Sequence, residues 1–305
     1  MNPLVSVVIP TYNHAHFLRK SLRSVLDQTY LSWEAIVVDN HSTDDTEEVV
    51  RGFQDPRIRL LKIHNQGVIA ASRNMGIRET KGDWIALLDA DDLWYPRKLE
   101  TLMAVVKSDE SYDVLCSDEY KVNCQTGAQS ILRYGPDDKN LYQKLLLEGN
   151  RLSPSATIIR RSFLERHQLV FGEFKDFIIV EDYDLWLNLA RTGAKFKFIR
   201  DVLGECVVHG ANNSANVTLL WSNCEKLLRT HVFEIQKFDK HPHRLWRQVA
   251  FRLDLIKVWH FYSKGQIPEA LSIAARATLL CPGGWIKQTY FRLRRHRNLR
   301  ISHVA

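Results

Sequence analysis

The stretch Lys81-Gly-Asp-Trp-Ile-Ala-Leu-Leu-Asp-Ala-Asp-Asp92 decides how the rest of the sequence is interpreted. Its segment from Trp84 to Leu88 is an almost unbroken apolar run, which is typical of a parallel strand that is covered on both faces. The run ends in three carboxylates, Asp89, Asp91 and Asp92. Because residues two apart on an extended chain project to the same side, Asp89 and Asp91 can address one ligand.

Two interpretations of these acids stay open on this stretch alone. Oxygen-rich clusters suit a hard divalent cation such as Mg or Mn, which can also hold a diphosphate. Alternatively, the acids form a solvated turn that caps a helix beginning near Tyr95.

Length and composition place the chain among soluble globular proteins. Its 305 residues suffice for one large domain or for a domain with an appendage. No apolar run approaches the roughly 18 residues that span a bilayer, and the N-terminus lacks the pattern of a secretory signal. The five cysteines are scattered without metal-ligand spacing, so buried thiols in a reducing compartment are expected. These features predict a cytoplasmic location.

The charge is distributed unevenly along the chain. Residues 1–218 hold 26 Lys/Arg against 30 Asp/Glu, a balance of −4. Residues 219–305 hold 16 against 5, a balance of +11, which completes the net charge of +7. The sequence therefore predicts two regions with different partners.

Strands and helices alternate four times before residue 110. The expected strands are Val5–Ile9, which Pro10 is expected to end, Trp33–Asp39, Arg57–Ile63 and the strand from Trp84. This alternation predicts an α/β fold with a parallel sheet and right-handed crossovers. Ligands of such sheets lie outside the carboxyl ends of the strands. Pro10–Asn13, Asp39 and Asp89–Asp92 are therefore expected to meet at one edge.

The absence of two nucleotide-binding motifs argues against some classes of ligand-binding site. The first strand is followed by neither a glycine-rich fingerprint nor a Walker lysine, which disfavours a dinucleotide dehydrogenase or a P-loop enzyme. A nucleotide at this edge would have its phosphates held by metal and carboxylates.

The second half of the chain is less regular. Strands are expected over 113–122 and 154–160, a hairpin return over 129–134, and two separate strands over 195–199 and 203–208. Glu181 and Asp182 begin a helix, where the helix dipole favours anions, so N-terminal capping is an alternative to catalysis. His209 ends the last strand.

Several motifs in this order resemble the inverting glycosyltransferases of family 2. They are Val5-Ser-Val-Val-Ile-Pro-Thr-Tyr-Asn13, Val38-Asp-Asn-His-Ser-Thr43, Asn65-Gln-Gly67, Ala71-Ser-Arg-Asn-Met-Gly76, Asp89-Ala-Asp91, Glu181-Asp182 and His209. The resemblance covers about residues 4–215. It implies the GT-A fold, a Rossmann-like, mixed but mainly parallel sheet flanked by helices.

The resemblance implies a role for each matching residue. Asp91 of the Asp-X-Asp motif would ligate a divalent metal, Mn or Mg, and His209 would be the distal metal or diphosphate contact. Asp182 would be the general base, and Glu181 would orient the acceptor. The implied nucleotide-binding residues are Pro10, Thr11 and Tyr12 against the nucleoside, Asp39 accepting from the base, Arg73 near the base or diphosphate, and Asp89 on the ribose side.

At three positions the resemblance does not decide the role of the residue. His41 stands where acidic or small residues are frequent, which leaves the base preference open. Asp92, a third acid, leaves open which two carboxylates hold the metal. Trp186 would either line the acceptor pocket or pack in the core.

The implied function is metal-dependent, inverting transfer of a sugar from a nucleotide-diphospho-sugar of the UDP type. The acceptor would be a hydroxyl of a glycan or of a lipid-linked molecule, in cell-surface polysaccharide synthesis. One alternative is an inactive sugar-nucleotide-binding scaffold. Another is a nucleotidyltransferase, although Pro10–Asn13 lacks the basic, glycine-rich loop that such an enzyme needs.

Near residue 217 the sequence changes to segments with helical spacing that are rich in Trp, Leu and basic residues. This change predicts a transferase domain over 1–217 and a basic helical extension over 218–305. Residues 285–300 combine six Lys/Arg with aromatic residues and no acid. This pattern suits an anionic membrane surface at the inner face of the cell membrane. A solvated basic face on a packing helix is the alternative. Nucleic acid is not expected as a partner, since no binding motif accompanies the charge.

Overall fold

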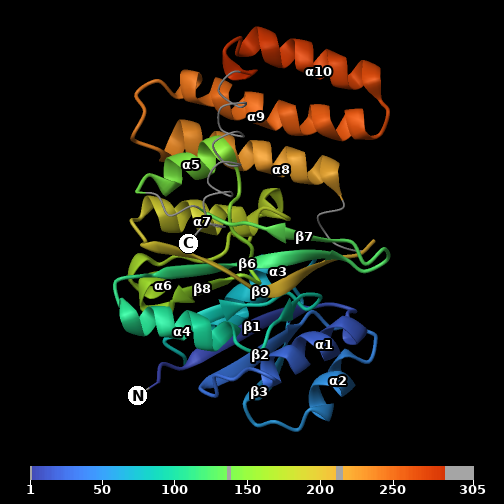
Figure 1. The fold of residues 1–305 in the computed structure, drawn as a ribbon, viewed down its shortest axis with the longest axis vertical. Coiled ribbons are helices and arrows are strands. Elements are labelled where there is room, and N and C mark those ends of the chain that lie inside the picture. The colour runs from blue at the N-terminus through green and yellow to red at the C-terminus, as the bar shows by residue number, and fades with distance from the viewer. Residues whose placement is uncertain (1, 136–138, 211–215, 286–305) are drawn as a thin grey trace, which may run out of the picture. The chain divides into compact units, whose positions relative to one another are not determined.

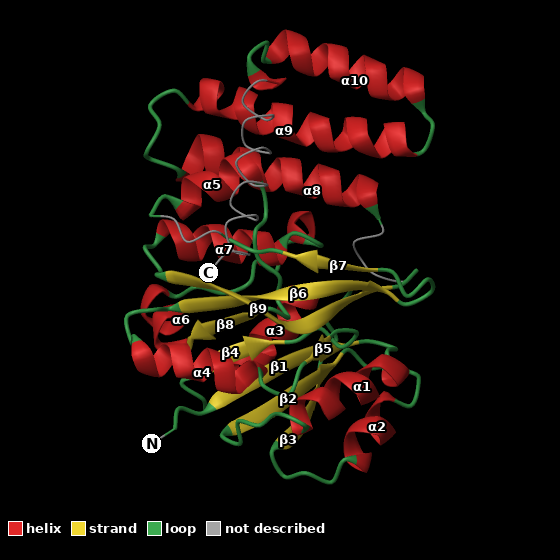
Figure 2. Cartoon of the chain, in the orientation of Figure 1, coloured by secondary structure: helices red, strands yellow, loops and turns green. Residues whose placement is uncertain are grey.

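The computed structural model describes residues 2–135, 139–210 and 216–285. They form two compact units, one of residues 2–142 with 150–220 and one of residues 143–149 with 221–285. The first unit holds the sheet and the second is helical (Figures 1 and 2). The domain boundary expected at residue 217 stays a prediction, because compactness does not test independent folding. The predicted basic segment 285–300 lies, except for Trp285, outside the described residues.

The first four strands of the sheet are parallel and lie in the order β3-β2-β1-β4. Apolar runs form these strands, and amphipathic helices connect them. The bounds are β1 Val5–Thr11, α1 Ala15–Leu26, β2 Trp33–Asp39, α2 Thr46–Gly52, β3 Ile58–Lys62, α3 Ile69–Arg78 and β4 Trp84–Leu87. Because the connections return each strand in the same direction, the carboxyl ends of β1, β2 and β4 share one edge. The predicted α/β fold class is confirmed.

The two faces of β1 are covered by different helices. Val7 and Ile9 belong to the main core, with Leu18 and Leu22 of α1 and with apolar residues of α4 (Lys98–Ser108). Val8 points to the opposite face, toward α3. A Cβ at Gly76 of α3 would lie 2.5 Å from Val8 Cγ1, so the glycine lets α3 pack closely onto the sheet. This close packing sets the position of Arg73, about one turn earlier on α3.

Pro10 does not end the first strand, contrary to the sequence prediction. The strand continues to Thr11, and Pro10 pairs with Val38 of β2. The carbonyl of Val8 accepts from Leu88 N–H at the end of β4, and residues two apart face the same neighbour. Pro10 therefore faces the side on which β4 has already ended, where no backbone donor is needed.

The rest of the sheet is mixed. Strand β8 (Thr157–Arg160) lies antiparallel between β4 and β6 (Val114–Asn123), and the predicted hairpin of β6 with β7 (Gln129–Leu132) is confirmed. The two strands expected over 195–208 are one strand, β9 (Phe196–Val208), parallel to β6. Irregular pairing near Ser117 and Asp118 lets β9 continue through the predicted break. With β5 (Leu93–Trp94), nine strands of the described chain form one sheet.

Further helices lie between the strands of this second group. They are α5 Leu141–Glu148, α6 Arg161–His167 and α7 Glu181–Arg191, with a 3₁₀ turn at Lys175–Phe177. Trp186 of α7 is fully buried, so it packs in the core. Within the described residues no two cysteines form a disulfide. Cys116 is buried, but Cys124 is exposed, so the expectation of buried thiols was wrong at Cys124.

The second unit contains most of α8 (Val217–Thr230), a π-helical turn (His231–Ile235), α9 (Pro242–Ser263) and α10 (Ile267–Leu280). Helices α9 and α10 run antiparallel (Figure 1) and pack through Phe251, Leu255 and Ala277. Among the helices that the structure describes, none combines the length and apolar character needed to cross a bilayer.

Candidate active site

A cavity of ≈ 580 Å³ opens at the carboxyl edge of the parallel strands. Its wall combines residues that the sequence places far apart. Those used below are Pro10, Thr11, Tyr12, His14, Asn40, Asn65, Arg73, Asp89, Asp91, Asp92, Glu181, Asp182 and Val207. The predicted site residues are thus brought together, except that Asp39 does not line the cavity and His209 reaches it by contacting Asp91.

The acids after β4 each have a different partner. Asp89 Oδ1 accepts from Arg73 at 2.7 Å. Asp91 Oδ2 lies 2.8 Å from His209 Nε2. Asp92 accepts from the Ser155 hydroxyl at 2.5 Å and from the Val207 N–H at 2.9 Å, and it is only 5% exposed. Both carboxylate oxygens of Asp92 are therefore used inside the protein.

Asp92 connects the end of β4 to the end of β9. Val207, which donates to it, precedes His209 by two residues, so Asp92 fixes the backbone that carries His209 toward Asp91. Burial raises the pKa of Asp92 well above its ordinary value, and the neighbouring carboxylates of Asp91 and Glu119 raise it further. These contacts favour Asp91 over Asp92 as a metal ligand.

His209 is held by aromatic packing. Its ring stacks on Phe17 with centroids 4.5 Å apart and meets His14 edge-on at 5.7 Å. Burial lowers the pKa of His14, against the opposing effect of Asp91. Sequence reasoning missed His14, whose only signal is that it directly follows the Pro10–Asn13 loop.

Arg73 joins the two sides of the cavity. It is 3% exposed, and its guanidinium donates to Asp89 Oδ1 and to Glu181 Oε1 at 2.6 Å. Burial alone would lower the pKa of Arg73, but the two carboxylates raise it above its ordinary value. Arg73 is therefore a permanent buried cation that ties the end of β4 to the start of α7.

Glu181 and Asp182 lie at the N-terminus of α7. Asp182 Oδ2 accepts from the Asn150 amide at 3.2 Å, and Oδ1 accepts from the Tyr183 N–H at 2.6 Å. Burial and the adjacent Glu181 raise the pKa of Asp182 to about 7, although Arg73 opposes them. Within the described residues, Glu181 Oε2 is buried without a hydrogen-bond partner. Asn150 had no signal in the sequence.

The side of the cavity formed by β1 and β2 offers groups for a nucleoside. Tyr12 is 53% exposed, and Thr11 Oγ1 is buried with no hydrogen-bond partner in the described part of the chain. Asp39 is buried and accepts from the N–H and hydroxyl of Ser42. The adjacent Asn40 lines the cavity instead, and its Oδ1 accepts from Asn65 N–H.

Asp91 and His209 can hold a divalent metal together with substrate. Within 2–135, 139–210 and 216–285, no three His, Cys, Asp or Glu residues are grouped as metal ligands. A carboxylate and an imidazole nonetheless fit a cation that completes its shell with diphosphate oxygens and water, as Mg²⁺ commonly does. This donor set is compatible with the predicted metal.

The sequence profile described as glycosyl transferase family 2 matches residues 6–168 of the chain, more than half of its length. The chain belongs to glycosyl transferase family 2. The matched region of this glycosyltransferase contains β1 to β4 and the acids after β4. The prediction of the family, and of an enzyme that transfers glycosyl groups, is confirmed.

Sequence relatives of this glycosyltransferase include proteins of Rickettsia typhi and Escherichia coli. An uncharacterized glycosyltransferase of Rickettsia typhi is 30% identical over 251 residues, which cover 79% of this chain and 77% of the relative. The UDP-Glc:alpha-D-GlcNAc-diphosphoundecaprenol beta-1,3-glucosyltransferase WfgD of Escherichia coli is 32% identical over 194 residues, or 62% of this chain and 70% of WfgD.

Solved structures support the GT-A fold. S. aureus TarS, residues 1–349 in complex with UDP, superposes with a TM-score of 0.63 at 19% identity, covering 82% of this chain and 71% of that one. The mannosyltransferase PcManGT from Pyrobaculum calidifontis, in complex with GDP-Man and Mn²⁺, has a TM-score of 0.59 at 21% identity and covers 99% of this chain and 83% of that one.

Proposed function

We propose that this glycosyltransferase catalyses metal-dependent, inverting transfer of a sugar from a nucleotide-diphospho-sugar to an acceptor hydroxyl. The observation that carries the proposal is the pairing of two carboxylate sites in one cavity. Asp91 with His209 provides a cation site, and Asp182, with its pKa raised to about 7, provides a base.

The proposed nucleotide site uses Pro10, Thr11 and Tyr12 against the nucleoside. The unpartnered hydroxyl of Thr11 supports this role, because a buried polar atom gains stability when a ligand satisfies it. Asp39 would contact the base after a local rearrangement of Ser42, and Asn40 extends the same wall. Asp89 would face the ribose, and Arg73 would lie near the base or the diphosphate.

The proposed metal ligands are Asp91 and His209, with Mn²⁺ or Mg²⁺ as the cation. When bound, such a cation neutralises charge on the leaving diphosphate and fixes its orientation. Asp92 takes no direct part, since both of its oxygens hold protein groups.

Asp182 is the proposed general base. Its carboxylate takes the proton of the acceptor hydroxyl as that oxygen attacks the anomeric carbon opposite the diphosphate. The bond between the anomeric carbon and the diphosphate breaks in the same step, so the configuration inverts and no covalent intermediate forms. The unpartnered Glu181 Oε2 can accept a second acceptor hydroxyl and orient the sugar.

The relatives support the substrate classes. TarS is solved with UDP and with UDP-GlcNAc, and PcManGT with GDP-Man and Mn²⁺. WfgD is named for UDP-Glc and a diphosphoundecaprenol-linked acceptor. These ligands are consistent with our proposal of a UDP-sugar donor and of a glycan or lipid-linked acceptor in cell-surface polysaccharide synthesis. The proposed location is the cytoplasm, with peripheral attachment to the inner membrane face.

The experiment is a panel of UDP- and GDP-sugars incubated with Mn²⁺, with Mg²⁺ and with chelator. Nucleoside diphosphate release should need a divalent cation and should be fastest with one UDP-sugar. Proton NMR of the transferred sugar should show the inverted anomer. A product with the configuration of the donor would contradict the mechanism, and full activity in chelator would contradict the role of the metal.

A further inference from the structure

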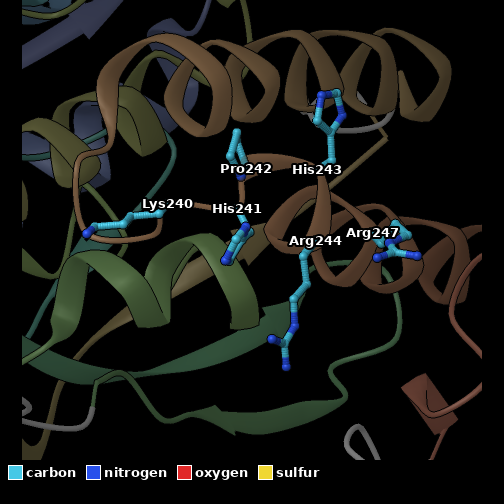
Figure 3. Close-up of a pocket in the computed structure, with 6 residues that line it drawn as sticks. All are labelled: Lys240, His241, Pro242, His243, Arg244 and Arg247. Carbon is cyan, nitrogen blue, oxygen red and sulfur yellow. The ribbon is translucent and has the colours of Figure 1, made fainter.

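The second unit has a cavity of its own at the start of α9. Its volume is ≈ 460 Å³, and we name it the basic hollow (Figure 3). It is lined by Lys240, His241, Pro242, His243, Arg244 and Arg247. Apart from the proline, every described lining side chain is Lys, Arg or His, and none is a carboxylate. The Lys, Arg and His side chains are all exposed, so the hollow is open to a large partner.

The position of the basic hollow on its helix strengthens its positive potential. Helix α9 starts at Pro242 and has no acidic residue in its first turn, and the N-cap His241 makes no side-chain capping hydrogen bond. The N-terminal end of a helix carries positive partial charge, which acids normally balance. Helix α7, by contrast, has Glu181, Asp182 and Asp184 in its first turn. Arg244 and Arg247 therefore add charge where the helix already favours an anion.

Aromatic rings border the basic hollow. Phe233 meets His243 and Trp246 with ring centroids 5.3 and 5.9 Å apart. Phe233 is 36% exposed, and Phe238, which precedes Lys240 by two residues in the sequence, is 43% exposed. The surface thus joins cationic groups to apolar ring edges.

The rings are poorly placed for nucleic-acid bases. The Arg229 guanidinium lies 4.8 Å from the centroid of Trp246 and 5.8 Å from that of Phe233. Base stacking needs an open ring face, whereas an anionic bilayer needs basic groups at the phosphates and aromatic residues at the interface.

Acidic residues nearby do not cancel the charge. Between residues 229 and 247 the acids are Glu234 and Asp239, against five Lys/Arg. The Asp239 carboxylate accepts from His241 N–H at 2.7 Å. The stretch keeps a positive balance on its exposed side.

We propose that the basic hollow and its bordering rings form a docking surface for an anionic phospholipid bilayer. Headgroup phosphates would lie in the hollow against Arg244 and Arg247, and Phe238 would enter the interfacial layer. The residues of this surface differ from those of segment 285–300, and the proposal does not depend on the chemistry of the first unit.

The test is cosedimentation of the full chain with phosphatidylcholine vesicles, with and without phosphatidylglycerol. Binding should require phosphatidylglycerol and weaken with salt. Charge reversal by Arg244→Glu with Arg247→Glu should lower the partition coefficient at least about tenfold. The matched control, Lys226→Glu with Lys264→Glu, makes the same charge change elsewhere in the unit and should lower it much less. Phe238→Ser should weaken binding several-fold and leave its salt dependence unchanged.

Thermal melts of every variant should match the wild type, which separates binding from folding. Equal losses in the test and control pairs, or wild-type binding after reversal at Arg244 and Arg247, would overturn the proposal. Competition by inorganic phosphate, or equally tight binding of a single-stranded oligonucleotide, would assign the basic hollow to a different anion and also overturn it.

Discussion

The end of β4 and the start of α7 both place adjacent acids on the same cavity, but they hold these acids differently. After β4, Asp89 is paired with Arg73, and Asp92 is enclosed by Ser155 and Val207. At α7, Glu181 takes the other end of Arg73, while Asp182 has an amide and a backbone N–H as partners. The Arg73 guanidinium thus contacts one acid of each group, Asp89 and Glu181.

The comparison shows that the neighbours of each carboxylate, and not its residue type, distinguish the proposed roles of these acids. Asp91 contacts His209, its proposed partner in holding a cation, whereas burial and Glu181 raise the pKa of Asp182 to about 7. A carboxylate that titrates near neutral pH can take a proton and later release it.

The largest expected loss of turnover follows from substitution of Asp91, the proposed metal ligand after β4. Asp91→Asn should lower turnover about a thousandfold, because a catalytic cation contributes several kcal/mol to the transition state. Calorimetric titration of Mn²⁺ in the presence of UDP should lose its signal as well. The control is Asp201→Asn, an exposed acid on β9, which should behave as the wild type. Unchanged Mn²⁺ affinity in Asp91→Asn would remove Asp91 from the metal site.

Substitution of the proposed base, Asp182, should lower turnover while metal binding is retained. Asp182→Asn should lower kcat by about a hundredfold, while Mn²⁺ and UDP still bind. Steady-state kinetics and the same titration measure both quantities. If Mn²⁺ binding fell together with kcat, the two acidic groups would not have separate roles.

Arg73, which bridges the two groups, should matter most for stability. Arg73→Met leaves Asp89 and Glu181 without their shared cation, and breaking such a buried pair costs about 3–5 kcal/mol of unfolding free energy. Urea unfolding measures the loss. Arg78→Met removes an exposed arginine of the same helix and should change stability by less than about 0.5 kcal/mol. A similar small change in Arg73→Met would show that the bridge contributes little.

The pH dependence of turnover should follow the protonation of Asp182. The base acts when deprotonated, and its pKa is raised to about 7. Turnover should therefore rise about tenfold per pH unit below that value and level off above it. Initial rates across this range, with metal binding checked at each pH, give the profile. A profile that is flat between pH 5 and 8 would be inconsistent with Asp182 as the base.

The smallest effect should come from Asn150, which donates to Asp182. Asn150→Ala removes a hydrogen bond to the charged form and should lower turnover at neutral pH by about two- to fivefold. The midpoint of the pH profile should move upward, since the ionised form loses support. Asn150→Asp should move it further. A downward shift in either variant would contradict the positioning role of Asn150.

The first half of the fold was predictable because its signals are local. Apolar runs defined β2 as Trp33–Asp39, and β3 was misplaced by one residue at each end. The loops after these strands then followed from the rule that parallel strands share a carboxyl edge. Pro10 was misjudged because its tolerance depends on where the neighbouring β4 ends.

The second half depends on contacts that no local pattern encodes. Strand β9 passes an irregular stretch of pairing with β6, so its sequence looked like two strands. One of the two partners of Asp92 is a backbone N–H 115 residues away, and backbone groups leave no trace in composition. The raised pKa of Asp182 likewise follows from burial and from its neighbours in space, while the sequence supplied only the acid itself.

The distance in sequence between Asp92 and Val207 also has a consequence for protein synthesis. The nucleotide side of the cavity, from β1 to β4, leaves the ribosome before Asp182, Val207 and His209 have been translated. A nascent chain can therefore begin to fold around its parallel strands while it still lacks the proposed base and the proposed second metal ligand. Such an intermediate would not consume the sugar nucleotides of the cell, and activity would begin when β9 joins β6.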